Sequence, residues 1–161
     1  QIFHGGMRAP EDLTGQQPVS ASENPCTEAH CGHSRGLSSE EIQGLIKSFG
    51  DAAVRCVEAG FDGVELHGAH GYLICQFLGE GTNRREDEWG GDIESRARFL
   101  LRIIEEVKSR VPDDFLIGVR ISPEYPKIGV RIEDSLTLSE LLVESGIDFL
   151  HISCWDCFIP S

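Results

Sequence analysis

The apolar positions of this chain recur with two different periods. Where they recur every three to four residues, one face of a helix is apolar and can pack on a core. Ser38 and Glu41 form the S-x-x-E pattern of a capping box, and Gly60 can supply the left-handed residue that ends the same helix. The periodicity predicts helices over residues 38–60, 92–111 and 131–146.

Short apolar runs lie between these helices and predict strands over residues 1–4, 61–67, 115–122 and 147–153. Strands that alternate with helices pair in parallel through right-handed crossovers, so the predicted fold class is α/β. Periodicity alone does not separate a closed barrel from an open sheet. Residues 10–37 are rich in Pro, Gly, Ser, Thr and Asn, so we expect a long loop there, or a small excursion such as a hairpin.

Composition and charge narrow the classes of function. The 161 residues are 40% hydrophobic and 25% charged, as in soluble globular domains. A net charge of -13 argues against nucleic acid or an anionic membrane as the main partner, and no apolar run is long enough to span a bilayer. Cys56 and Cys75 lie among apolar residues, so we expect a reduced, cytoplasmic protein rather than a disulfide framework.

Polar residues lie within or just past the predicted strands. They are Gln1, His67, Arg120, His151 and Ser153. Ligands bind at the C-terminal ends of the strands both in (β/α)8 barrels and in open α/β sheets. The sequence therefore predicts an active site on that side of the sheet.

The strand predicted over 61–67 ends with His67, and His70 and Tyr72 follow it closely. Imidazoles can hold a carbonyl or phenolate oxygen, and a tyrosine hydroxyl can donate a proton. Each histidine alone could simply hydrogen-bond the turn, and the pair is also compatible with a metal site that lacks an evident third ligand. The three side chains together favour an active site.

Arg120 ends an apolar strand and needs an anionic or strongly accepting partner, because an unpaired buried charge is costly. A nearby carboxylate and an electron-rich ligand remain equally open as that partner. The arginines at 84, 85, 96 and 98 lie among acidic residues, and we interpret most of them as members of an ion-pair-laced loop. The pairs Cys26/Cys31 and Cys154/Cys157 have spacings seen in metal or redox sites, and their roles stay open.

Four segments resemble the Old Yellow Enzyme family of NAD(P)H:flavin oxidoreductases: QIFHGGMRA, AGFDGVELHGAHGYLICQFL, TNRREDEWGGDIESRARF and IGVRISP. The resemblance implies a TIM barrel that holds non-covalent FMN. It also implies that NAD(P)H reduces the flavin, which then passes hydride to the β-carbon of an activated alkene, such as an enone or enoate.

The resemblance also implies roles for individual residues. Gln1 matches a side chain that bonds the flavin pyrimidine, and Arg120 matches a cation near the flavin N1/O2 edge. His67 and His70 match the pair that grips the electron-withdrawing oxygen of the substrate, and His67 is also expected to contact the cofactor. Tyr72 matches the proton donor.

We expect residues 1–161 to form a single partial FMN-binding TIM-barrel domain, roughly strands 3 to 6, with the first and last βα units missing. The expected partner is a small molecule rather than nucleic acid or a membrane, with homo-oligomerisation possible for the full-length protein. Two alternatives are a metal-dependent TIM-barrel hydrolase that uses His67 and His70, and a non-catalytic half-barrel that assembles with another chain. The physiological alkene and the choice between NADH and NADPH are not determined by the sequence.

Overall fold

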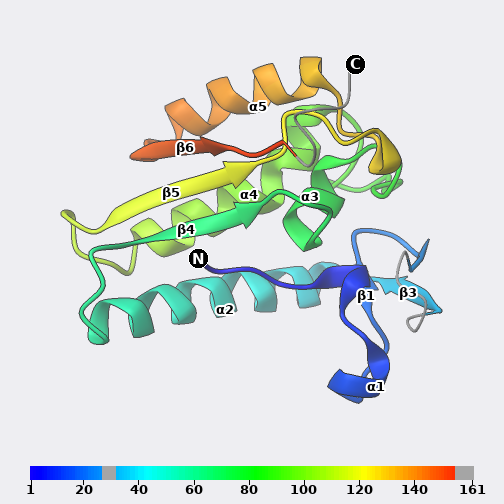
Figure 1. Ribbon diagram of the computed structural model, residues 1–161, viewed down its shortest axis with the longest axis horizontal. Helices are drawn as coiled ribbons and strands as arrows, with labels where there is room; N and C mark the ends of the chain where they lie inside the picture. The colour runs from blue at the N-terminus through cyan, green and yellow to red at the C-terminus, as the bar shows by residue number, and fades with distance from the viewer. Residues whose placement is uncertain (27–31, 155–161) are drawn as a thin grey trace.

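A parallel sheet forms the centre of the computed structural model, which describes residues 1–26 and 32–154 (Figure 1). Its strands are β4 (Gly63–Gly68), β5 (Leu116–Ile121) and β6 (Phe149–Ile152), paired in parallel in that order. Ile2 makes a further parallel bridge to Leu66, so the N-terminal segment runs along the free side of β4. The predicted α/β arrangement with parallel strands is confirmed.

Three long helices pack against this sheet, namely α2 (Ser39–Glu58), α4 (Ile93–Lys108) and α5 (Ile132–Glu144) (Figure 1). The capping box of α2 forms as predicted, because the Glu41 N–H donates to Ser38 Oγ and the Ser38 N–H donates to the Glu41 carboxylate. Gly60 has a φ of +79° just after α2, where a side chain would be strained. All three predicted helices are therefore confirmed.

The alternation of side chains along the strands separates the core from the predicted site. Leu66 and Val119 are fully buried in the cluster formed with α2 and α4, where the rings of Phe77 and Phe99 stack at 4.4 Å. Because successive strand residues point to opposite faces, His67 lies on the other face of the sheet. The parallel register sets it beside Arg120 of β5, and Arg120 in turn beside His151 of β6.

A short helix, α3 (Leu73–Leu78), follows the turn after β4, and the periodicity did not predict it. All six of its residues are buried, so it has no polar face to reveal a helical period. Burial raises the pKa of the Cys75 thiol within it to about 12, which keeps this cysteine protonated and inert. The sequence shows that this run is apolar. A short run that is buried on every side can be a helix or a strand, so the pattern did not predict its conformation.

The segment predicted as a loop holds a small excursion at its C-terminal part. The excursion consists of three short strands, β1 (Val19–Ser20), β2 (Asn24–Pro25) and β3 (His33–Gly36). Two short helices, η1 (Gly6–Arg8) and α1 (Glu11–Thr14), precede it in the chain. Strand β3 pairs antiparallel with β2, as in the expected hairpin, and parallel with β1. Buried Asn24 anchors the excursion, because its Nδ2 donates to the Thr82 carbonyl at 2.8 Å and its Oδ1 accepts from Arg84.

The arginines of the loop before α4 bind backbone carbonyls more than carboxylates, which corrects the ion-pair interpretation. Arg85 Nη1 donates to the carbonyls of Ala21 and Leu37 at 2.8 and 2.6 Å, and Arg85 also forms one ion pair, with Asp87, at 2.6 Å. These contacts tie the loop to the excursion at β1 and β3. Charge-assisted bonds to carbonyls satisfy backbone acceptors that have no strand or helix partner.

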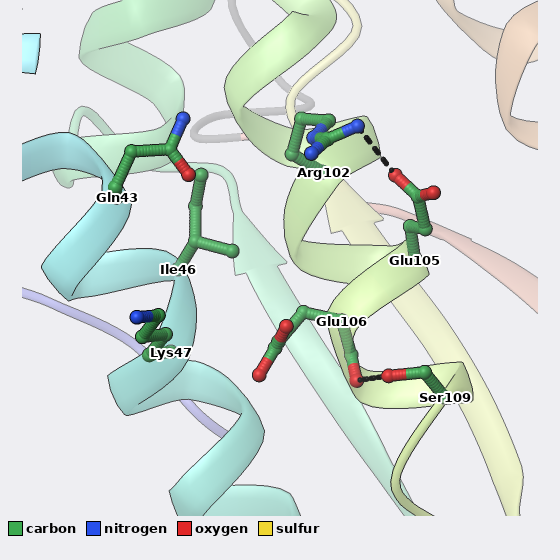
Figure 2. A pocket seen from close by; sticks show the side chains of 7 residues that line it. All are labelled: Gln43, Ile46, Lys47, Arg102, Glu105, Glu106 and Ser109. Atoms are coloured by element: carbon green, nitrogen blue, oxygen red, sulfur yellow. Dashed lines mark hydrogen bonds and ion pairs between the residues drawn. The ribbon is translucent and has the colours of Figure 1, made fainter.

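A hollow of about 210 Å³ lies between α2 and α4, on the helical side of the molecule (Figure 2). Its lining includes Lys47 of α2 and Glu106 of α4, and Figure 2 shows Arg102 paired with Glu105 on its rim. It is separated from His67 and Arg120 by the sheet itself. None of the helices in the described ranges is long and apolar enough to cross a membrane.

Candidate functional site

The turn that follows β4 brings three segments of the chain together. His70 has a φ of +59°, uncommon for a residue other than glycine, and Gly71 continues the turn with a φ of +72°. The His70 N–H donates to Ser122 Oγ at 3.1 Å, and its carbonyl accepts from Arg8 Nη1 at 2.7 Å. Bonds from two other segments therefore hold a backbone conformation that costs about 1 kcal/mol or more.

His67, His70 and Tyr72 gather as predicted. The ring centroid of His67 lies 5.0 Å from that of His70 and 5.2 Å from that of Tyr72, and Phe3 packs against Tyr72 at 5.1 Å. The guanidinium carbon of Arg8 stands 4.9 Å from the centre of the Tyr72 ring, within cation–π range. Tyr72 is also the residue that precedes the first turn of α3, so its position is set by that helix.

Sequence reasoning missed Arg8 as a member of the site. Its segment, QIFHGGMRA, was recognised for Gln1 alone. Arg8 reaches the site because several hydrogen bonds hold the N-terminal segment beside the turn, among them Leu73 N–H to the His4 carbonyl at 3.0 Å and Met7 N–H to Gln76 Oε1 at 3.1 Å. No local pattern signals a contact between residues more than 60 positions apart in the chain.

A nearby carboxylate and an electron-rich ligand were the two open explanations for Arg120. In the described ranges Arg120 forms no ion pair with a carboxylate, although its charge interacts with that of Glu65. Its Nη2 donates to Ser153 Oγ at 2.8 Å, while its Nε is buried and has no hydrogen-bond partner among those residues. The Nδ1 atom of His67, whose residue is only 4% exposed, is likewise buried and unpaired there. Buried polar atoms are nearly always hydrogen-bonded, so these two orphan atoms on one face of the sheet fit a bound polar ligand.

A second cluster, formed by Gln1, Glu65 and His151, lies on the same face of the sheet as His67 and Arg120. Glu65 accepts hydrogen bonds from the Gln1 amide and from His151 Nδ1, the latter at 2.8 Å. Burial opposes the charged form of Glu65, but the hydrogen bonds from His151 and Gln1 and the charges of His151 and Arg120 lower its pKa on balance. Glu65 therefore holds Gln1 in place, a role that the sequence did not predict.

Both site histidines are neutral at neutral pH. Burial, together with the neighbouring charges of His70 and Arg120, lowers the pKa of His67 to about 4. Burial and the charges of Arg120, Arg8 and His151 also lower the pKa of His70. A neutral imidazole carries one N–H, so each histidine can donate one hydrogen bond to a ligand oxygen.

We expect the imidazole of His67 to titrate near pH 4. Between pH 6.5 and 4 the unfolded chain binds a proton that the folded state rejects, so the free energy of unfolding falls as the pH falls through this window and is unaffected above it. An NMR titration of the His67 ring, assigned with His67→Gln, measures the midpoint. The variant should also lose less stability than the parent between pH 7 and pH 5; a midpoint at 6.5 or above contradicts the expectation.

The metal hypothesis for His67 and His70 gains no support from the surroundings of the two rings. No group of three His, Cys, Asp or Glu residues able to hold a metal ion occurs in the part of the chain that the structure describes. The spacings of Cys26/Cys31 and Cys154/Cys157 are not tested, because Cys31 and Cys157 lie outside the described residues.

Known oxidoreductases match this chain over nearly its whole length. The chain is 43% identical over 161 residues to the probable NADH-dependent flavin oxidoreductase YqiG of Bacillus subtilis (strain 168), with 97% of this chain and 43% of the relative covered. It is 42% identical over 167 positions to the NADH:fumarate oxidoreductase of Klebsiella pneumoniae (strain 342), with 100% of this chain and 18% of the relative covered.

Solved structures give the same result. The old yellow enzyme homologue from Zymomonas mobilis superimposes with a TM-score of 0.84 at 32% identity, over 92% of this chain and 45% of that one. The chain therefore spans less than half the length of each of these proteins. The model of the NADH:flavin oxidoreductase / NADH oxidase family matches residues 1–157, nearly the whole chain. The chain belongs to this family, as its resemblance to Old Yellow Enzymes predicted.

Proposed function

We propose that this chain carries the substrate-binding and part of the flavin-binding site of an FMN-dependent oxidoreductase that reduces activated alkenes with hydride from NAD(P)H. The observation that carries the proposal is the pair of buried, unpaired atoms, His67 Nδ1 and Arg120 Nε, on the sheet face that also holds Tyr72. A polar, electron-rich ligand on this face would satisfy both atoms. The family itself supports FMN and a nicotinamide reductant as the cofactors.

Gln1, His67 and Arg120 are the residues that would hold FMN. Bound FMN would supply two-electron chemistry, taking hydride from the nicotinamide and delivering it to the β-carbon of the alkene. Arg120 is permanently charged and cannot give up its proton, so it would favour an anionic group placed against it. Glu65 tethers the Gln1 amide nitrogen, which leaves the amide oxygen of Gln1 to accept from a ligand N–H.

The roles of the remaining side chains follow from their chemistry. His67 and His70 would donate hydrogen bonds to the electron-withdrawing oxygen of the alkene and so stabilise the negative charge that develops there during hydride addition. Tyr72 would then give its phenolic proton to the α-carbon. Fumarate, named for the Klebsiella relative, has a double bond conjugated to carboxylates, which is the class of substrate that this arrangement suits.

We also propose that the strands of this chain are roughly strands 3 to 6 of a TIM barrel, with the described sheet face lining its interior. Phe3, Leu116 and Phe149 lie on the same face as His67 and are 56%, 47% and 43% exposed. Such apolar side chains are normally covered, and further βα units closing the barrel would cover them. The share of its relatives that this chain spans supports the same proposal.

Substitution of His67 by alanine tests the proposed function. In the flavin-loaded protein, His67→Ala should weaken the binding of a phenol by about 10- to 100-fold, because it removes one hydrogen bond to a phenolate oxygen. Titration of the flavin absorbance with the phenol measures the dissociation constant.

His33→Ala is the matched control, since His33 is an exposed histidine of β3, in the excursion. It should leave the dissociation constant within twofold. Unchanged phenol affinity in His67→Ala would argue against the proposed hydrogen bond from His67 to the substrate oxygen. An equal loss of affinity in both variants would indicate a general structural effect.

A further inference from the structure

Ser153, which follows β6, stands between two residues of the site. Its Oγ lies 2.8 Å from Arg120 Nη2 and 2.8 Å from His70 Nε2. The residue is buried, and its position is fixed by a backbone hydrogen bond from its N–H to the Ile121 carbonyl of β5 at 2.9 Å. The hydroxyl thus links a charge on β5 to the turn after β4.

The direction of these two hydrogen bonds follows from the donors available. A guanidinium can only donate, so Ser153 Oγ accepts from Arg120. The hydroxyl has one proton of its own, and His70 Nε2 is the acceptor within reach among the described residues. If Nε2 carried a proton instead, the buried hydroxyl proton of Ser153 would be left without an acceptor in that region, which is unfavourable. The arrangement that satisfies every proton runs from Arg120 to Ser153 to His70.

We propose that Ser153 is a positioning residue that fixes His70 as the Nδ1–H tautomer by relaying the hydrogen bond of Arg120. With Nε2 accepting, Nδ1–H is the one donor of the His70 ring. The part of this inference that concerns the substrate, namely that this N–H binds its oxygen, rests on the proposed function. The tautomer itself does not depend on it.

The charges around His70 act in the same direction. Arg120 from β5, Arg8 from η1 and His151 from β6 all disfavour a proton on its ring, as does burial. The His67 ring on β4 lies 5.0 Å away and would add a like charge if it were protonated. His70 is therefore held neutral by its surroundings, and Ser153 selects which nitrogen keeps the single proton.

Nitrogen-15 NMR of the histidine rings, in the protein with and without flavin, tests the proposal. His70→Gln identifies the signals of His70 among those of the six histidines. The parent protein should show protonated Nδ1 and unprotonated Nε2. In Ser153→Ala the population protonated at Nε2 should rise, and the proton affinity of the His70 ring should increase about three- to tenfold, because a hydrogen bond to the neutral form is lost.

Ser153→Thr keeps the hydroxyl and should retain the parent tautomer, which separates the role of the hydroxyl from packing. A proton on Nε2 in the parent protein, or unchanged ring signals in Ser153→Ala, would overturn the proposal. The parent spectrum decides the first point even if the alanine variant does not fold. The histidine signals are measured without phenol or alkene, so they test the tautomer alone. The proposed function is tested separately, by the phenol affinity of His67→Ala. Failure of one can therefore be distinguished from failure of the other.

Discussion

With Tyr72 as the proposed proton donor, Tyr72→Phe should slow the reoxidation of the reduced flavin by an activated alkene about 10²- to 10⁴-fold, the range typical of a lost general acid. The substitution removes only the phenolic oxygen. The ring that packs against Phe3 and His67, and over which Arg8 lies, is kept. Reduction of the flavin by NADH needs no proton from this residue and should keep its rate. Stopped-flow absorbance measures the two half-reactions separately.

Tyr125→Phe is the matched control, because Tyr125 is the other tyrosine of the chain and precedes the short helix η2 (Pro126–Ile128). It should change neither half-reaction more than about threefold. A Tyr72→Phe variant that still reduces the alkene at the parent rate would exclude Tyr72 as the proton donor. A parallel loss in both half-reactions would indicate that the variant has disturbed the flavin site instead.

Arg96→Met should lower the free energy of unfolding by about 3 kcal/mol, since it breaks a buried, charged hydrogen-bond network. The Arg96 residue is 4% exposed. It donates to the Leu78 carbonyl at the end of α3, to the Gly91 carbonyl at 3.1 Å, and to Asp134 of α5 at 2.9 Å. The side chain thus joins α3, whose start carries Tyr72, to two other segments. Urea unfolding monitored by circular dichroism measures the loss.

Arg102→Met supplies the comparison within the same helix. Arg102 pairs with Glu105 on the surface of α4, where the two side chains are 53% and 68% exposed, so its removal should cost less than about 1 kcal/mol. Equal losses in the two variants would show that the buried contacts of Arg96 stabilise the fold no more than the exposed pair of Arg102 does.

The difference between α2 and α3 shows which helices a sequence can reveal. Helix α2 has an apolar face, an exposed polar face, a capping box and a terminal glycine, and all of these signals are local. Helix α3 is six residues long and buried on every side, so a helix and a buried strand look alike in its pattern. Three of the four predicted strands were placed to within about two residues of β4, β5 and β6, because their apolar runs are flanked by turns and helix caps. The strand predicted over residues 1–4 forms only the single bridge of Ile2 to Leu66.

Some residues of the candidate site could likewise be predicted from local sequence, and others could not. The positions of His67 at the end of β4 and of His70 and Tyr72 just after it could be predicted, because parallel strands of an α/β fold present their C-terminal ends at one edge. The resemblance to a family then suggested a separate task for each. Glu65 and Arg8 were missed, since each is recognised only by partners that lie 62 or more positions away in the chain.

The sequence by itself determined the order of strands and helices, the parallel pairing that this order requires, and the side of the sheet on which the polar residues lie. These properties depend on residues close together in the chain, through periodicity and capping. Tertiary structure alone decided that Arg120 meets Ser153 rather than a carboxylate among the described residues, and that His70 shares the same hydroxyl. Those contacts join the ends of three strands, and their geometry exists only once the sheet has brought the strands side by side.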